Sequence, residues 1–246
     1  MNTYFVITIS FLILIIIIFC VKDKDSLDNK DIENSIVIQC NAGLCNRLRV
    51  IFSYYILAQK QNKELIVVWK NNKECPGYFK DFFEPIKDIS FTNNNKLKVY
   101  YKGWDTHPDY PPDYSPLKLK SHMLNIIKQK RGKLDNKYNA VHIRRTDHIS
   151  NAKKYNLYTD DKQFIDFINK NSDKNLYIAT DNKKTYNQFK NKFNNLVKLP
   201  YHKTLSRLRK TILKDSIIDL YMCIYADKFM GSEWSTFSEL IKTLRT

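Results

Sequence analysis

The first strong feature of the chain is an apolar run close to its start. Tyr4 to Val21 are eighteen residues of apolar character, interrupted only by Thr8 and Ser10. An α-helix of that length spans about 27 Å, which is close to the thickness of a bilayer's hydrocarbon core. No basic residue precedes the run, and the segment Phe19–Lys22 lacks the small residues of a cleavage site. The pattern therefore favours an uncleaved anchor over a cleaved signal peptide.

These observations predict a transmembrane signal-anchor over residues 1–21 and a charged stalk over residues 22–34. Lys22 and Lys24 follow the apolar run, and by the positive-inside rule they favour a cytoplasmic side for the rest of the chain. We expect a single-pass membrane protein, with its orientation left open.

Beyond the stalk, apolar runs alternate with helical patterns. Ile36–Cys40 is a short apolar run that ends in the turn residues 41–43, which is typical of a buried strand. Arg47–Gln61 has apolar residues at helical spacing, and Leu65–Trp69 is a second apolar run. The order strand, helix, strand predicts a βαβ unit with a parallel sheet.

The middle of the chain is less regular. Residues 97–101 are predicted to form a strand and residues 117–129 a helix. The segment 104–116 between them carries four of the seven prolines and is expected to be a loop. The basic and polar stretch 130–137 is taken as the boundary between two domains.

The second half again alternates strands and helices, which predicts a second doubly wound α/β domain. We expect an N-terminal Rossmann-like domain over residues 35–130 and a C-terminal one over residues 131–246. The expected strands and helices of the second domain are, in order, Ala140–Ile143, Asp160–Asn169, Leu176–Ala179, Lys183–Phe193, Leu196–Leu199, Thr204–Ala226, Phe229–Met230 and Thr236–Leu244.

The formal net charge of +16 at first suggests a nucleic-acid partner. However, 33 of the 41 basic residues are Lys, and they are spread along the chain rather than grouped. A lysine-coated, solvated surface explains this distribution, so we expect no nucleic-acid binding. The few arginines are more informative, because Arg47 with Arg49 and Arg144 with Arg145 form two tight clusters. A planar guanidinium donates two parallel hydrogen bonds, which a lysine cannot do.

The five cysteines have no spacing that fits a zinc site. A bridge between Cys40 and Cys45 would cross a short turn, and we keep it as an alternative.

Four polar segments each follow a predicted strand: Asn41–Arg47, His142–His148, Thr180–Asn182 and Gly231–Ser238. In a doubly wound sheet, the loops at the carboxyl ends of the strands line the ligand crevice. A turn that opens a helix can bind an anion through its N–H groups. The alternative is that the last two segments only cap the helices that follow them.

Arg144 and Arg145 would repel each other if nothing compensated their charges. A diphosphate would do so, because its oxygens match guanidinium forks. The alternative is an internal ion pair with Asp147, and both can hold if Asp147 orients one arginine while the other binds phosphate.

Together, these segments resemble the fucosyltransferase superfamily. The stretch Gly43–Arg49 with Leu65–Trp69 is similar to the N-terminal signature of its α1,6-fucosyltransferase and nodulation fucosyltransferase (NodZ-like) branch. Further segments are similar to the C-terminal motifs of that branch: His142–Asp147, Tyr177–Asn182, Asp219-Leu220, Ala226-Asp227 and Gly231–Ser238. The resemblance implies a GT-B fold of two Rossmann-like domains that binds GDP-fucose without a metal or other cofactor.

The resemblance also implies roles for individual residues. Arg144 would contact the β-phosphate in the role that a metal ion plays elsewhere, and His142 and Asp181 would hold the guanine and ribose. The complete set of implied GDP-sugar-binding residues is Asn46, Arg47, His142, Arg144, Arg145, Asp181, Ser232, Ser235 and Ser238.

The implied reaction is an inverting transfer of fucose to a glycan or glycoprotein acceptor. Relatives carry a glutamate about ten residues after the histidine of the first C-terminal motif, where this chain has Ala152. Asp147, His148 and Asp160 remain as alternative bases, and Arg144, Asp147 and His148 form the predicted catalytic set. A transferase with another nucleotide sugar and an inactive sugar-nucleotide-binding module remain alternatives. The resemblance also implies a type II protein of the Golgi or endoplasmic reticulum.

Overall fold

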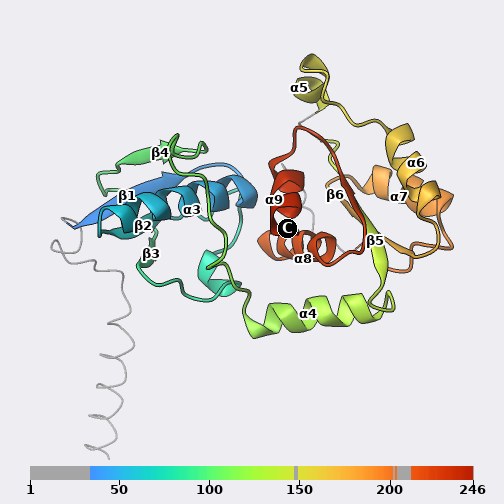
Figure 1. Cartoon of the computed structure of the whole chain (residues 1–246), viewed down its shortest axis with the longest axis horizontal. Helices are drawn as coiled ribbons and strands as arrows, with labels where there is room; N and C mark the ends of the chain where they lie inside the picture. The colour runs from blue at the N-terminus through green and yellow to red at the C-terminus, as the bar shows by residue number, and fades with distance from the viewer. Residues whose placement is uncertain (1–33, 147–148, 202, 204–211, 246) are drawn as a thin grey trace, which may run out of the picture.

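The chain folds into an α/β structure with two parallel sheets. The computed structural model describes residues 34–146, 149–201, 203 and 212–245. Every pairing between the named strands of this part of the chain is parallel. The first sheet and the second lie at opposite ends of the molecule, and helices α8 (Leu213–Ile224) and α9 (Thr236–Leu244) lie between them (Figure 1).

The first sheet has the strand order β3-β2-β1-β4. Its strands are β1 (Ser35–Cys40), β2 (Glu64–Val68), β3 (Ile89–Thr92) and β4 (Tyr101–Gly103). The two central strands are buried at every residue after the first. Continuous runs of Ile and Val suit strands that are covered on both faces, and β1 and β2 therefore form where the apolar runs predict them.

Helix α3 (Leu44–Lys60) connects β1 to β2 and starts three residues before the predicted position. Leu44 and Cys45, which precede the predicted start at Arg47, are buried with the rest of its apolar face. The turn before it places Ala42 in the left-handed region at φ 64°. A non-glycine residue in this region is uncommon.

The third and fourth strands differ from the prediction. Strand β3 was not predicted, and β4 begins at the last residue of the predicted strand 97–101. Leu97 and Val99 instead pack against the apolar face formed by Val37, Ile66 and Val68. Their alternation therefore reflects packing on the outside of the sheet and not membership of it.

The second sheet has the order β6-β5-β7. Its central strand β5 (Tyr138–Ile143) is buried at all six residues and pairs with β6 (Asn175–Thr180) and β7 (Phe229–Gly231). Helices α6 (Asp161–Lys170) and α7 (Lys183–Lys192) cover the outer face of this sheet (Figure 1).

The side chains before α6 and α7 explain where these helices begin. Asp160 and Gln163 form a reciprocal capping box at the start of α6. The Asn182 side chain accepts a hydrogen bond from the Thr185 backbone N–H at the start of α7.

Two predictions in this half need correction. Residues 196–199 form no strand in the described chain, although the Leu196 carbonyl accepts one hydrogen bond from the Leu176 N–H at 2.9 Å. The short helix α5 (Ile149–Lys154) was not predicted. Of the predicted helix Thr204–Ala226, the residues 204–211 lie outside the described chain, and α8 forms the remainder.

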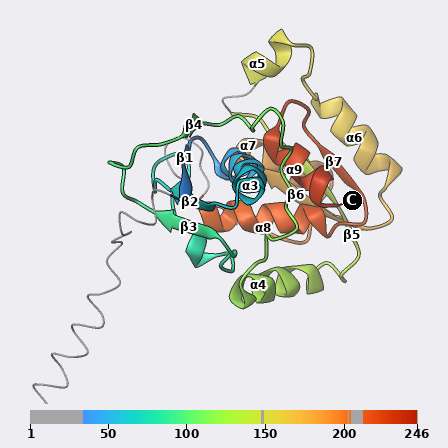
Figure 2. The ribbon, with the colours of Figure 1, turned by 60° about the vertical axis from the view of Figure 1, so that its left-hand side comes forward.

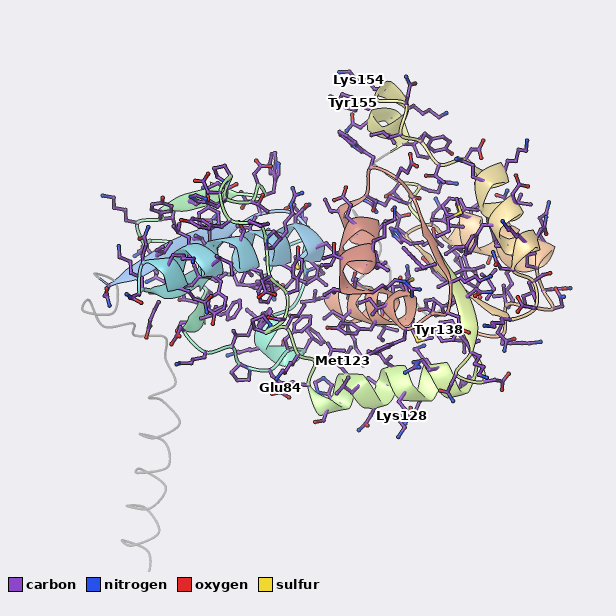
Figure 3. All side chains as sticks on the ribbon, viewed as in Figure 1. Glu84, Met123, Lys128, Tyr138, Lys154 and Tyr155 are labelled. Atoms are coloured by element: carbon purple, nitrogen blue, oxygen red, sulfur yellow. The ribbon has the colours of Figure 1, made fainter. Side chains whose placement is uncertain are left out.

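Helix α4 (Ser121–Gly132) joins the two halves, and the predicted boundary after residue 130 falls in its last turn. Met123 is fully buried and points from α4 toward the body of the molecule, whereas exposed Lys128 points away (Figure 3). The short 3-10 helix η1 (Phe79–Asp81) packs nearby through buried Phe79.

One apolar core runs through both halves. It contains residues of β1, β2 and α3 together with residues of β5, β6, α8 and α9. Figure 2 shows α3 and α9 side by side, in agreement with their contacts. The two sheets are therefore held by shared packing across α8 and α9.

The predicted membrane segment, Tyr4–Val21, and the stalk lie outside the described residues. Within the part that the structure describes, no helix is both long and apolar enough to cross a bilayer. Cys40, Cys45, Cys75 and Cys223 are buried free thiols, so the alternative Cys40–Cys45 bridge is wrong. Burial raises the pKa of the Cys40 thiol to about 12, which makes it an unreactive thiol.

Candidate functional site: a cleft between the two sheets

A cleft opens where the carboxyl ends of the two sheets face each other. Its open space, counted out to the solvent, is about 940 Å³. The first half contributes Gly43 and Asn46 from the start of α3, and Glu74 and Pro76 from the loop after β2. The cleft therefore lies where doubly wound sheets bind ligands.

The second half contributes the charged wall of the cleft. Arg144 follows β5, Asp181 follows β6, and Ser235 lies in the loop between β7 and α9. Lys203 and Asp219 also line this wall. Of the predicted site residues, the structure thus brings Asn46, His142, Arg144, Asp181 and Ser235 to one cleft.

Asp181 organises the arginine segment. Its Oδ1 accepts the Arg145 backbone N–H at 3.0 Å, and its Oδ2 accepts hydrogen bonds from the Arg144 guanidinium and the Thr146 hydroxyl. Burial by itself raises the pKa of this carboxyl, but Arg144 and the hydrogen bonds from Thr146 and Arg145 outweigh it and hold the pKa below its usual value. Asp181 is therefore an ionised carboxylate that fixes Arg144.

Arg145 is directed away from the cleft. Its Nη2 donates to Asp161 Oδ1 at 2.6 Å, and its Nη1 donates to the carbonyls of Arg144 and Thr159 at 3.0 and 3.2 Å. The guanidinium lies 5.2 Å from the Tyr158 ring centroid. The two arginines thus pair with Asp181 and Asp161, while the Asp147 of the predicted ion pair lies outside the described residues, as does His148.

His142 is buried beside the cleft and is neutral. Its Nδ1 lies 2.8 Å from Ser238 Oγ. Burial is the largest cause that lowers its pKa, to about 3, although Asp181 opposes the shift. In a neutral imidazole ring, one nitrogen donates a hydrogen bond and the other accepts one.

Ser232 and Gly231 hold the β5 and β7 ends together. Ser232 N donates to the His142 carbonyl at 2.9 Å, and Ser232 Oγ accepts the Arg144 N–H at 2.9 Å. A Cβ at Gly231 would lie 2.5 Å from Ser238 Oγ, so only glycine fits there. Ser232, Ser238, Arg145 and Arg47 are not among the described residues that line the cleft, and their predicted contacts with a donor stay predictions.

The start of helix α9 also faces the cleft, through Ser235, Thr236 and Phe237. The Ser235 side chain makes no capping hydrogen bond to its own helix in the described chain. The first-turn N–H groups of a helix have no partner within the helix and favour anions. This helix end and the Arg144 guanidinium therefore give the second wall two separate anion-binding elements.

Sequence reasoning missed a buried ion pair in the same wall. Lys203 Nζ contacts Asp219 and the Thr180 carbonyl, and both side chains of the pair are 4% exposed. The Tyr177 hydroxyl donates to Asp219 Oδ1 at 2.7 Å. Asp219 lies within a recognised motif and could have been selected on that ground. Nothing in the local sequence distinguishes Lys203 from the many other lysines.

Asn46 stands out in the opposite wall. Its Oδ1 is buried and has no hydrogen-bond partner among the described residues. Buried polar atoms are nearly always paired in folded proteins, and an exception calls for an explanation such as a bound ligand.

Arg47, one residue further on, lies beneath this wall and is fully buried. It donates to the carbonyls of Ala42 and Lys70 at 2.9 and 2.7 Å, and to Asn72 Oδ1 at 3.0 Å. Its guanidinium also lies 4.7 Å from the Trp69 ring centroid. Through these contacts Arg47 holds together the turn before α3 and the loop after β2.

Ala152 is buried in a smaller space beside Arg145 and Tyr158, outside the main cleft. Within the described residues, no group of three or more His, Cys, Asp and Glu side chains could hold a metal ion. The expectation of a metal-independent reaction remains a prediction.

The fold is similar to those of solved fucosyltransferases. NodZ α1,6-fucosyltransferase co-crystallised with GDP matches with a TM-score of 0.63 and 15% identity, covering 86% of this chain and 92% of that one. Fucosyltransferase NodZ from Bradyrhizobium matches with a TM-score of 0.62, 15% identity and coverages of 86% and 93%. POFUT1 in complex with GDP matches with a TM-score of 0.61, 11% identity and coverages of 86% and 95%. At these identities the likeness establishes the fold.

The sequence profile of the GDP-fucose protein O-fucosyltransferase family matches residues 114–246, which is more than half of the chain. The chain belongs to this family and is a fucosyltransferase. No curated protein sequence matches the chain. The resemblance that the motifs predicted is confirmed.

Proposed function

We propose that this enzyme transfers fucose from GDP-fucose to a hydroxyl group of a glycan or glycoprotein, with the donor bound in the cleft between the two sheets. The observation that carries the proposal is the position of Arg144. Asp181 fixes its guanidinium in the cleft wall, which also contains the start of α9. Two anion-binding elements in one wall suit a diphosphate.

The chemistry follows from where charge develops. When the bond between C1 of fucose and the β-phosphate oxygen breaks, negative charge builds on the leaving GDP. A guanidinium already held in place stabilises this charge more in the transition state than in the ground state. Arg144 and the N–H groups of α9 then act on the leaving group, and the implied stereochemical outcome is inversion.

We assign the base of the donor to His142. Its neutral ring lines the cleft, and such a ring can donate one hydrogen bond and accept another. Asp181 already accepts hydrogen bonds from Arg144, Arg145 and Thr146, so we assign it to positioning. Asp219 is likewise engaged, by Lys203 and the Tyr177 hydroxyl, and has the same kind of role.

Asn46 supports a hydroxylated sugar opposite the diphosphate. Its unpartnered Oδ1 can accept a hydrogen bond from a fucose hydroxyl and so gain the partner that it lacks. NodZ has been soaked with GDP-fucose and POFUT1 crystallised with it, which fits the same donor here. The proposal extends to a GT-B arrangement of two Rossmann-like domains and to a membrane-anchored location for the enzyme.

Calorimetry with GDP, GDP-fucose, GDP-mannose and UDP-sugars tests the donor. We expect GDP and GDP-fucose to bind and UDP-sugars to bind at least tenfold more weakly. Release of GDP in the presence of a glycan array then tests transfer. Preference for UDP-sugars would contradict the proposal. Binding of GDP-fucose without transfer to any acceptor would favour an inactive binding module, the alternative raised by Ala152.

A further inference from the structure

The carboxylate of Glu74 is held at the cleft by the backbone of the neighbouring loop. Its Oε2 accepts the Ala42 N–H at 2.9 Å, and the residue is exposed on the first-sheet wall. Ala42 presents this N–H from its left-handed conformation, at φ 64°. Such strain persists where the surrounding structure imposes it, and it often accompanies a functional site. This contact holds Oε2 of Glu74 in place, and the position of the second oxygen, Oε1, follows from it.

The loop that carries Glu74 is fastened from below. Asn72 Oδ1 accepts the backbone N–H groups of Glu74 and Cys75, each at 3.1 Å. The same oxygen accepts Arg47 Nη2, while Arg47 Nε holds the Ala42 carbonyl. One buried guanidinium therefore fixes both Glu74 and the loop that orients its carboxylate.

The other carboxylates of the cleft are already paired with cations. Among the described residues that line it, the acidic side chains are Glu74, Asp181 and Asp219. Asp181 pairs with Arg144 and Asp219 pairs with Lys203. Of these three, Glu74 is the one without a cationic partner in the described chain.

Inverting transfer also requires a base across from the leaving group. The acceptor oxygen approaches C1 in line with the breaking bond, so the base and the phosphate lie on opposite sides of the sugar. The proposed phosphate residue, Arg144, belongs to the second-sheet wall, whereas Glu74 belongs to the first-sheet wall. The exposure of Glu74 lets an acceptor reach it from solvent.

We infer that Glu74 is the general base of this enzyme, an assignment that rests on the proposed function. The Glu74 carboxylate accepts the proton of the acceptor hydroxyl as the acceptor oxygen bonds to C1 of fucose. The C1–O bond to the β-phosphate breaks, and its electron pair leaves with GDP. Glu74 then returns the proton to solvent. Relatives carry a glutamate in the second half of the chain, where this protein has Ala152. Glu74, on the first-sheet wall, takes the role of that glutamate.

Glu74→Gln is the sharpest test, because glutamine still accepts the Ala42 N–H but does not take a proton. General bases contribute about 10²–10⁴-fold in rate. We expect kcat to fall at least about 10²-fold while the Kd for GDP-fucose changes less than twofold. Glu64→Gln is the matched control, since Glu64 is an exposed glutamate at the amino end of β2. It should transfer at the wild-type rate.

Chemical rescue separates a base from a structural residue. In Glu74→Ala, added formate should restore part of kcat, because a small carboxylate can enter the vacated space and accept the proton. A Glu74→Gln protein with wild-type kcat would overturn the assignment, as would a loss of kcat matched by an equal loss of donor affinity. Failure of the wild-type protein to bind GDP-fucose would instead overturn the proposed function, and the role of Glu74 with it.

Discussion

The Asp181 carboxylate holds the Arg144 guanidinium with one oxygen and the Arg145 backbone N–H with the other, at 3.0 Å. The carboxylate therefore fixes both the side chain that lines the cleft and the chain direction after β5. Arg145, in turn, pairs with Asp161 of α6 at 2.6 Å. The adjacent arginines thus have different roles: Arg144 lines the site and Arg145 anchors the segment to helix α6.

Replacing Arg144 with Ala should remove the main stabilisation of the leaving diphosphate. Loss of one such donor typically costs about 10²–10³ in kcat, or roughly 3–4 kcal/mol of transition-state free energy. Steady-state kinetics of fucose transfer would measure it. Arg49→Ala serves as the control, because Arg49 bonds the Trp104 carbonyl outside the cleft lining. Equal kinetics for Arg144→Ala and the wild type would contradict the role of Arg144.

Asp181→Asn should weaken GDP binding. It should also make the free energy of unfolding less dependent on pH in the acidic range. The pKa of Asp181 is below its usual value when folded, so its contribution to stability is present above the unfolded pKa of about 3.9 and is lost as pH falls through the folded pKa. Urea unfolding at pH 7 and pH 3 would show it. The stability gap between wild type and Asp181→Asn should narrow at pH 3, and a gap that widens would exclude this role.

His142 should make the protein less stable in mild acid. Burial lowers its folded pKa to about 3, whereas an unfolded histidine titrates near pH 6.5. The unfolded chain therefore binds the proton first, and stability falls as pH drops below about 6.5. The slope from this one group is at most about 1.4 kcal/mol per pH unit. Comparing urea midpoints of wild type and His142→Asn between pH 7 and pH 5 tests this, and identical pH slopes would argue against it.

Gly231→Ala should damage the site, while Gly132→Ala should not. At Gly231 the new methyl group would lie 2.5 Å from Ser238 Oγ and push it away from His142. At Gly132, in the last turn of α4, no described atom lies within 4 Å of an added Cβ. We expect a lower melting temperature and weaker GDP binding for Gly231→Ala, and up to about 1 kcal/mol of added stability for Gly132→Ala. Equal effects of the two changes would refute the packing argument.

The sequence predicted the buried strands well, because β1, β2, β5 and β6 are nearly continuous apolar runs. It missed β3, whose first three residues are only half-buried at the edge of the sheet. It also assigned a strand to Leu196–Leu199, where Leu196 and Val197 pack in one cluster with residues of α7 and the segment does not join the sheet. Apolar runs report burial, and they identify a strand only when a neighbouring strand pairs with it.

The site was predictable at the ends of strands and not elsewhere. Segments that follow β1, β5, β6 and β7 reach the sheet edge by topology alone, so Asn46, Arg144 and Asp181 were found. Sequence could not decide which of two adjacent arginines faces the cleft, because successive residues leave a strand in opposite directions. Glu74 and Lys203 belong to irregular segments that only tertiary packing brings to the site.

The apolar core that passes through α8 and α9 has a consequence for how the enzyme admits its substrates. Because α3 packs on α9, wide hinge-like opening of the two halves would strip buried side chains from each other. Entry and exit of the nucleotide then fall to the loops around the cleft. For the same reason, either half expressed alone would expose its part of the shared apolar core, and the two halves should unfold as one cooperative unit.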